Sequence, residues 1–154
     1  MTDKPEAVHI IHIAAPAQKV WEALTDSALS PSYFFGNRFE FGEKGGDFRV
    51  VQPDGQVNSQ GKVLVRDEPH VLRVTWDVIA YPDMRAETPG EVEFRLEDLG
   101  GVVRVTVSEF NRPAGAKPYE DSAREGWSLI LSGIKSILET GEPMPQVQPK
   151  GPEQ

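Results

Sequence analysis

The chain has 154 residues, of which 24 are acidic and 16 are basic, so its formal net charge is -8. This length is typical of one domain with one hydrophobic core. A negative field repels phosphate backbones and anionic lipid head groups, which argues against nucleic acid as a partner. The sequence contains no cysteine, so disulfides, thiolate nucleophiles and thiolate metal sites are excluded.

The two ends of the chain also carry information. The N-terminal residues lack the apolar run of a signal peptide, and no segment approaches the ~20 apolar residues of a membrane span. We therefore expect a cytoplasmic protein without a membrane span. Residues 142–154 are rich in Pro, Gln and Gly, which predicts a disordered tail behind a single domain at residues 1–141.

The first third of the chain predicts one strand and two short helices. Residues 7–13 are β-branched and alternate loosely, which indicates a strand. Pro16 suits the first position of a helix, whose apolar residues recur at helical spacing as far as Leu24. Asp26 is placed to cap a second short helix that extends to about Phe34.

Between Asn37 and Glu109 the apolar residues recur with a period of two, which is typical of strands. Stretches rich in Gly, Pro and Asp separate the segments, as hairpin turns do. The alternate positions are polar, so each strand should have one buried and one solvated face. About six strands are predicted here. Their apolar positions are Phe39, Phe41, Phe48, Val50, residues 57–65, Leu72, Val74, Trp76, Val78, Val92, Phe94, Leu96, Val103, Val105 and Val107.

A long amphipathic helix is predicted from about Tyr119 to Thr140, and Gly141 ends it. Gly126 and Gly133 lie seven residues apart on nearly one side of this helix. They either permit the close approach of another backbone or are tolerated surface glycines. The apolar stripe of the helix consists of Ala123, Trp127, Ile130, Leu131, Ile134, Ile137 and Leu138.

The order of these elements predicts an α+β fold. The order is one strand, two short helices, a run of hairpin-connected strands and one long helix. Only the long helix can then cover the concave face of the sheet. We therefore expect a helix-grip architecture, in which a curved antiparallel sheet of about six to seven strands wraps around the long C-terminal helix.

Three segments carry a resemblance to a known family. They are Ile13 to Asp26, Gly61 to Trp76, and Gly126-Trp127 with the apolar residues that follow at Leu131, Ile134 and Leu138. In this order they resemble the START-like (SRPBCC) superfamily, in the branch similar to the activator of the heat-shock-protein-90 ATPase. The resemblance covers residues 8 to 140 and implies the helix-grip fold. One segment differs, since Tyr33-Phe34-Phe35-Gly36 stands where such chains often carry Trp-Phe-Gly.

The resemblance leaves the function open, because the superfamily includes binders of hydrophobic molecules, a few cyclases and a chaperone activator. In a grip fold Trp76 and Trp127 should approach the same interior space, where they are either plain core or walls of a cavity of ~300–1,000 Å³. For a cavity, the predicted ligand-binding residues are Tyr33 and Phe34 near the mouth, Phe48, Trp76, Phe94, Val105, Trp127 and Leu131 as walls, and Glu109.

Glu109 ends the last predicted strand and faces the interior by alternation if no bulge intervenes. Buried, the carboxylate needs a hydrogen-bond partner and could orient a ligand or exchange protons; otherwise it is a solvated strand end. His9 and His12 are three apart in a strand and point to opposite faces, so they cannot share a metal. We expect a structural role for His70. No phosphate, zinc or dinucleotide motif is present, and no metal or cofactor is predicted.

Three functions are compatible with these features. The first is non-covalent binding of a small hydrophobic or amphipathic molecule. The second is protein interaction, as an activator of a chaperone ATPase or in a stress response. The third, a cyclase or hydrolase, ranks last, because it needs two interior ionisable groups and the sequence offers at best Glu109 and one N-terminal histidine.

Overall fold

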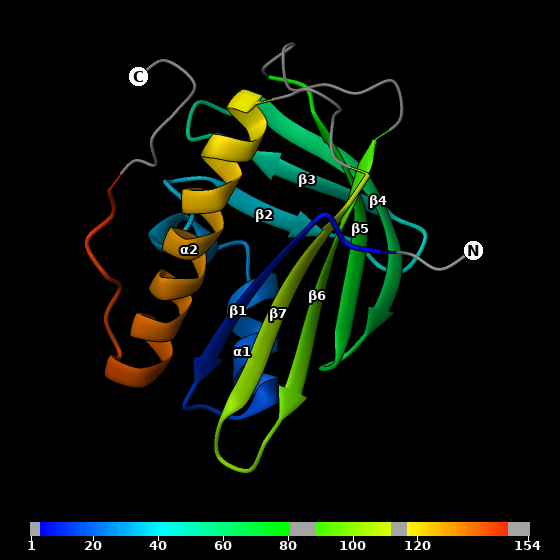
Figure 1. Ribbon diagram of the computed structural model, residues 1–154. Helices are drawn as coiled ribbons and strands as arrows, with labels where there is room; N and C mark the ends of the chain where they lie inside the picture. Colours follow the sequence, from blue (N-terminus) through cyan, green and yellow to red (C-terminus); the bar gives the residue numbers. More distant parts are fainter. Residues whose placement is uncertain (1–3, 81–88, 112–116, 148–154) are drawn as a thin grey trace.

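The computed structural model describes residues 4–80, 89–111 and 117–147. Within these ranges seven antiparallel strands form one sheet in the order β1-β7-β6-β5-β4-β3-β2, accompanied by two α-helices (Figure 1). The predicted α+β helix-grip fold is confirmed. The strands are β1 (Ala7–Ile13), β2 (Arg38–Phe41), β3 (Asp47–Val51), β4 (Val57–Asp67), β5 (Val71–Val78), β6 (Gly90–Asp98) and β7 (Val103–Phe110), and the helices are α1 (Ala17–Thr25) and α2 (Lys117–Thr140).

The sheet is strongly curved, so that β2 and β3 cross the direction of β6 and β7 in Figure 1. Its register shifts in β3 between Val50 and Val51 and in β4 between Val63 and Val65, and such bulges bend a strand and increase its twist. In β4 a Cβ on Gly61 would lie 1.9 Å from the Thr75 carbonyl oxygen, so only glycine fits there. The bent strands leave a concave face that α1 and α2 cover.

The second predicted short helix is a single 3-10 turn, η1 (Ser30–Ser32). The Asp26 carboxylate accepts a hydrogen bond from the Ala28 N–H at 2.9 Å, as a capping residue does. The turn does not extend into a helix because Phe35 and Gly36 have left-handed backbones, with φ of 53° and 82°. Pro16 lies one position earlier than predicted, as the N-cap of α1.

Among the described residues, one hydrophobic core lies between the concave face and the helices. The period-two residues of β5, β6 and β7 are buried on the inner side, apart from Trp76, which is only partly buried. Neither helix has, in its described residues, the length and the apolar composition that crossing a lipid bilayer requires.

The middle of α2 lies directly against the turn at η1. A Cβ on Gly133 would lie 2.7 Å from the Tyr33 Cβ, closer than real side chains approach. At Gly126 no described atom lies within 4 Å of such a Cβ. Close backbone approach therefore explains Gly133 and does not explain Gly126.

The Tyr33 side chain links η1 to the end of α1. It is 2% exposed, and its hydroxyl donates to the Ala23 carbonyl at 2.9 Å and lies 3.3 Å from the Leu24 carbonyl. These carbonyls belong to the last turn of α1, which has no intrahelical donors for them. Tyr33 thus caps α1 from inside the core.

Side chains of α2 also hold the end of the edge strand β1. The Lys135 ammonium donates to the His12 carbonyl at 2.7 Å, and the Glu139 carboxylate accepts from the Ala14 N–H at 2.8 Å. The Ala14 N–H and then Lys135 lower the pKa of Glu139 below its usual value. Strand β1 is therefore fixed on one side by β7 and at its end by α2.

Beyond Gly141 the described chain includes residues 142–147. The Gln146 amide accepts from the Phe35 N–H at 2.6 Å and donates to the Pro31 carbonyl at 3.0 Å. Residues 148–154 lie outside the described residues, and the domain and tail boundaries stay predictions.

The two glycines of α2 provide a test of its packing. We expect Gly133→Ala to lower the free energy of unfolding by roughly 1–3 kcal/mol, because the new methyl group overlaps Tyr33. Gly126→Ala is the matched control, which should be neutral or stabilising by up to about 1 kcal/mol because alanine favours helix. Urea unfolding of both variants measures this. Equal losses in the two variants would contradict the close approach.

The buried Tyr33 predicts an alkaline effect on stability. Burial, and secondarily the nearby Asp26 carboxylate, raises the pKa of Tyr33 above its usual value. The folded chain keeps this phenol neutral. Its contribution to the free energy of unfolding is therefore complete below about pH 10 and is lost as the pH rises further. Tyr33→Phe should cost roughly 1–3 kcal/mol at neutral pH and weaken the alkaline loss. Urea midpoints between pH 7 and 11, measured for both proteins, should converge; parallel curves would refute this.

Candidate ligand site

Two ionisable side chains meet on the concave face at one end of the sheet. Pairing of β1 with β7 places His9 opposite Val107 and Ala7 opposite Glu109, so His9 and Glu109 are diagonal neighbours on one face. The His9 Nε2 lies 3.0 Å from the Glu109 Oε2. The register of β7 continues to Phe110 without a bulge, which is the condition for Glu109 to face inward.

The Glu109 carboxylate is buried, whereas the His9 side chain reaches the surface. Glu109 is 1% exposed, and the side chain of His9 is 17% exposed. A carboxylate removed from water needs hydrogen-bond donors or an opposite charge, and His9 supplies one such partner when its Nε2 carries a proton. The sequence left open whether Glu109 is a buried carboxylate or a solvated strand end, and in the structure it is buried.

An aromatic cluster begins beside His9. The His9 ring lies 6.4 Å from the Trp127 ring, between centroids, and Trp127 lies 5.6 Å from both Trp76 and Phe94. The tryptophan pair and the Trp127–Phe94 pair are edge-on, at 69° and 71°, an arrangement that aromatic rings favour. Phe48 continues the cluster, 4.8 Å from Trp76. We call His9, Glu109, Trp76, Trp127 and Phe94 the aromatic site.

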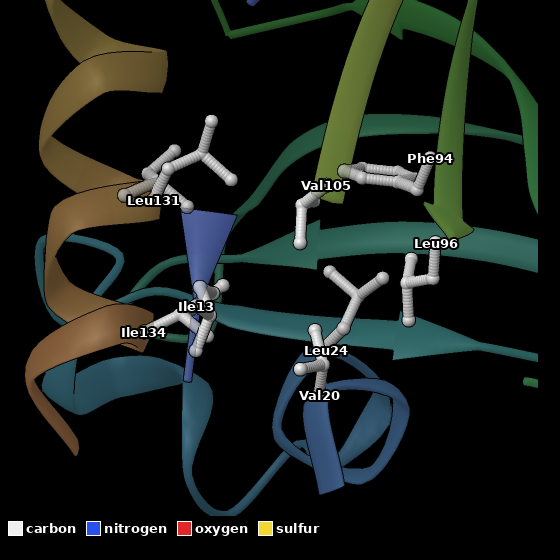
Figure 2. Close-up of a pocket in the computed structure, with 9 residues that line it drawn as sticks. Ile13, Val20, Leu24, Phe94, Leu96, Val105, Leu131 and Ile134 are labelled. Atoms are coloured by element: carbon white, nitrogen blue, oxygen red, sulfur yellow. The ribbon is translucent and has the colours of Figure 1, made fainter. Parts of the chain in front are cut away.

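A separate, wholly apolar hollow lies farther along the concave face, between the sheet and both helices (Figure 2). Its volume is about 10 Å³, which is room for one water molecule at most. Ligand sites usually measure ~300–1,000 Å³. A ligand could enter this hollow only if side chains moved apart. The lining residues are Ile13, Val20, Leu24, Phe94, Leu96, Val105, Ile130, Leu131 and Ile134.

The predicted ligand-binding residues divide into three groups. Phe48, Trp76, Phe94, Glu109 and Trp127 come together at or beside the aromatic site. Val105 and Leu131 line the apolar hollow, which Phe94 also borders.

The third group differs from its predicted position. Tyr33 and Phe34, expected near a mouth, are buried at η1, with 2% and 8% exposure. They pack there because Tyr33 caps α1 and lies against Gly133, contacts that the local sequence pattern does not indicate.

His9 is absent from the predicted ligand-binding residues, although the sequence offered one of the two N-terminal histidines as an interior ionisable group. Counting back by twos from the buried Ile13 would have placed it inward, since Ile13, Ile11 and His9 share one face of β1. The signal is weak because β1 is apolar on both faces, with Val8 48% and Ile10 56% exposed on the other side.

The charged residues Arg73, Glu91 and Glu93 belong to the outer face of the sheet. The Arg73 guanidinium lies 2.7 Å from the Glu91 carboxylate and 3.5 Å from that of Glu93, so these acids belong to a solvated charge ladder. Among the described residues, no group of three or more histidines and acids could hold a metal ion. The aromatic site can therefore orient a bound molecule by hydrogen bonds and charge, or exchange a proton with it.

Comparisons with known proteins agree with this architecture. Similar solved structures include protein MLL2253 from Mesorhizobium loti, with a TM-score of 0.71 and 20% identity over 86% of this chain and 97% of that chain. An HSP90 activator from Plasmodium falciparum, PFC0360w, has a TM-score of 0.70 and 18% identity over 88% of this chain and 96% of that chain. The Aha1 dimer from Colwellia psychrerythraea has a TM-score of 0.69 and 18% identity over 87% and 96%.

At these identities the solved structures show a shared fold. No match is found among curated proteins. A family model described as Activator of Hsp90 ATPase homolog 1-like protein matches residues 14–139, which include α1, all strands after β1 and nearly all of α2. The chain therefore belongs to the family of Activator of Hsp90 ATPase homolog 1-like proteins, in the START-like superfamily.

Proposed function

We propose that this protein binds a small, largely apolar or aromatic molecule at the aromatic site. The observation that supports this best is the buried Glu109 carboxylate, which contacts His9, whose ring lies beside the aromatic cluster of Trp127, Trp76 and Phe94. Binding sites for small molecules are mostly apolar with a few polar groups that fix orientation, and this set of residues has that composition.

Stability alone gives a weaker account of the pair. A buried carboxylate pays a desolvation cost, and apolar residues of similar volume often serve a core as well or better. Two members of the site are also accessible, since Trp76 is only partly buried and the His9 side chain is 17% exposed. A ligand could therefore reach the pair from the end of the sheet by displacing rings that already contact solvent.

Protein interaction is a second candidate, favoured by a different observation. Val8 and Ile10 form an exposed apolar pair on the outer face of the edge strand β1. The similar protein from Plasmodium falciparum is described as an HSP90 activator. In this case Val8→Ser with Ile10→Ser should abolish stimulation of a chaperone ATPase and leave small-molecule binding unchanged.

The neutral fluorescent probe N-phenyl-1-naphthylamine tests the proposed function. We expect its emission to rise on binding to the wild type, and Trp76→Ala to weaken its affinity roughly fivefold or more through lost apolar contact. Leu99→Ala is the control, because Leu99 is an apolar side chain that is 48% exposed at the hairpin after β6. Circular dichroism verifies that both variants fold. Absence of probe binding to the wild type, or equal weakening in both variants, would refute the proposal.

A further inference from the structure

We propose that the surface formed by η1 and the second half of α2 is a docking site for an extended Met-Pro-Gln segment of a partner protein, and that residues 142–147 of this chain occupy it as a tethered competitor. The proposal is independent of ligand binding at the aromatic site. It follows from the path of this segment, from the groups that recognise Gln146, and from how little of the segment is buried.

The chain turns back on α2 as soon as the helix ends. The Ser136 hydroxyl donates to the Glu142 carbonyl at 2.9 Å, and the residues that follow, orange to red in Figure 1, run back along the helix and reach η1. Pro143 and Pro145 keep this stretch out of a helix, because proline fixes φ at about −65° and has no N–H to donate. The segment therefore lies across η1 and α2 in the manner of a bound peptide.

Two backbone groups at η1 recognise the side-chain amide of Gln146. Its Oε1 accepts from the Phe35 N–H at 2.6 Å, and its Nε2 donates to the Pro31 carbonyl at 3.0 Å. A carboxamide presents an acceptor and a donor side by side, whereas a carboxylate has no donor and an ammonium group has no acceptor. This part of the surface is therefore selective for glutamine at the position of Gln146.

Met144 supplies an apolar anchor beside Gln146. It is half-buried, whereas Pro143 and Pro145 on either side of it are exposed. Met144 and Gln146 both border a hollow of about 10 Å³ on the surface, together with Leu129 of α2. The surface thus contacts the methionine and the glutamine of the segment and leaves the proline between them in solvent.

The contacts of the segment are few and lie at the surface. The hydrogen bonds of Gln146 and the bond between Ser136 and Glu142 are exposed, and Val147 is 56% exposed. Segments with few buried apolar contacts and exposed hydrogen bonds open at a small cost in free energy. The segment of a partner can therefore replace residues 142–147 while the domain stays folded.

Fluorescence anisotropy with a fluorescein-labelled peptide of residues 141–147 tests the docking site. Met144→Ser with Gln146→Ala, made in the 154-residue chain, removes both anchors of the tethered segment. The peptide should bind this double variant about tenfold more tightly than the wild type, because a short tether holds its segment at an effective concentration in the millimolar range. Glu142→Gln is the matched control, since the carbonyl of Glu142 bonds Ser136 and its exposed carboxylate does not. This control should bind the peptide as the wild type does.

Two measurements assign the binding to the proposed contacts. A peptide with Gln146→Glu should bind the double variant about fivefold more weakly, because a carboxylate cannot donate to the Pro31 carbonyl. In the ¹⁵N-labelled double variant, the unaltered peptide should shift the amide resonance of Phe35 and leave that of Leu99, on the hairpin after β6, in place.

Hydrogen exchange provides a test that does not use the double variant. Because the Phe35 N–H donates to Gln146, its amide should exchange several-fold faster in Gln146→Ala than in the wild type, and an excess of the peptide should restore its protection. Unchanged exchange would show that residues 142–147 do not occupy the site, and the proposal would be wrong.

The peptide measurements have equally definite outcomes. Equal affinity for the wild type and the double variant would show that the tethered segment does not compete. Lack of binding to the double variant at millimolar peptide, or resonance shifts away from Phe35, would overturn the docking site. Equal binding of the glutamine and glutamate peptides would overturn the selectivity for glutamine. Circular dichroism verifies that each variant folds.

Discussion

The closeness of α2 to the turn at η1 is the contact on which the interior depends. Tyr33 caps the last carbonyls of α1 from below, and Gly133 lets α2 lie directly on it, so α1, η1 and α2 form one support. Trp127 lies six residues before Gly133, about 9 Å along the helix axis. The contact between Gly133 and Tyr33 therefore fixes the distance of Trp127 from the sheet. A side chain at position 133 would shift Trp127 away from His9 and Trp76. The aromatic site thus depends on a glycine that does not belong to it.

The aromatic site also depends on which alternate residues of β1 and β7 face the interior. A slip of one residue would turn Val8 or Ile10 inward in place of His9, and a slip in β7 would exchange Glu109 for Ser108. Since β1 is apolar on both faces, burial of apolar area selects its register only weakly. The bond between His9 and Glu109 does select it, because a slipped β1 would leave the buried carboxylate without the imidazole. The same pair can therefore fix the edge strand in the folded protein.

Local periodicity predicted most of this fold, and long-range packing accounts for what it missed. The strand at residues 7–13 was predicted with its exact bounds, and the long helix, expected from Tyr119, begins at Lys117. Both predictions used the spacing of apolar residues along a short segment, which shows which face of the element is buried. The inward direction of Glu109 followed from alternation in the same way. The burial of Tyr33 and Phe34 did not, because Tyr33 packs against Gly133, a hundred residues away, and Phe34 packs against Phe39 on the next strand. The pairing of Glu109 with His9 likewise joins residues that are a hundred positions apart in the sequence.

The packing of the described residues bears on where on the concave face a ligand could be accommodated. In the apolar hollow, all nine lining side chains are buried, and admitting a ligand would separate contacts that the core keeps in its resting state. At the aromatic site the corresponding movement involves Trp76 and His9, which already have contact with solvent, so fewer buried contacts are lost. On this balance, the proposed ligand is expected to bind at the end of the sheet where Glu109 lies, and the middle of the core would stay unchanged.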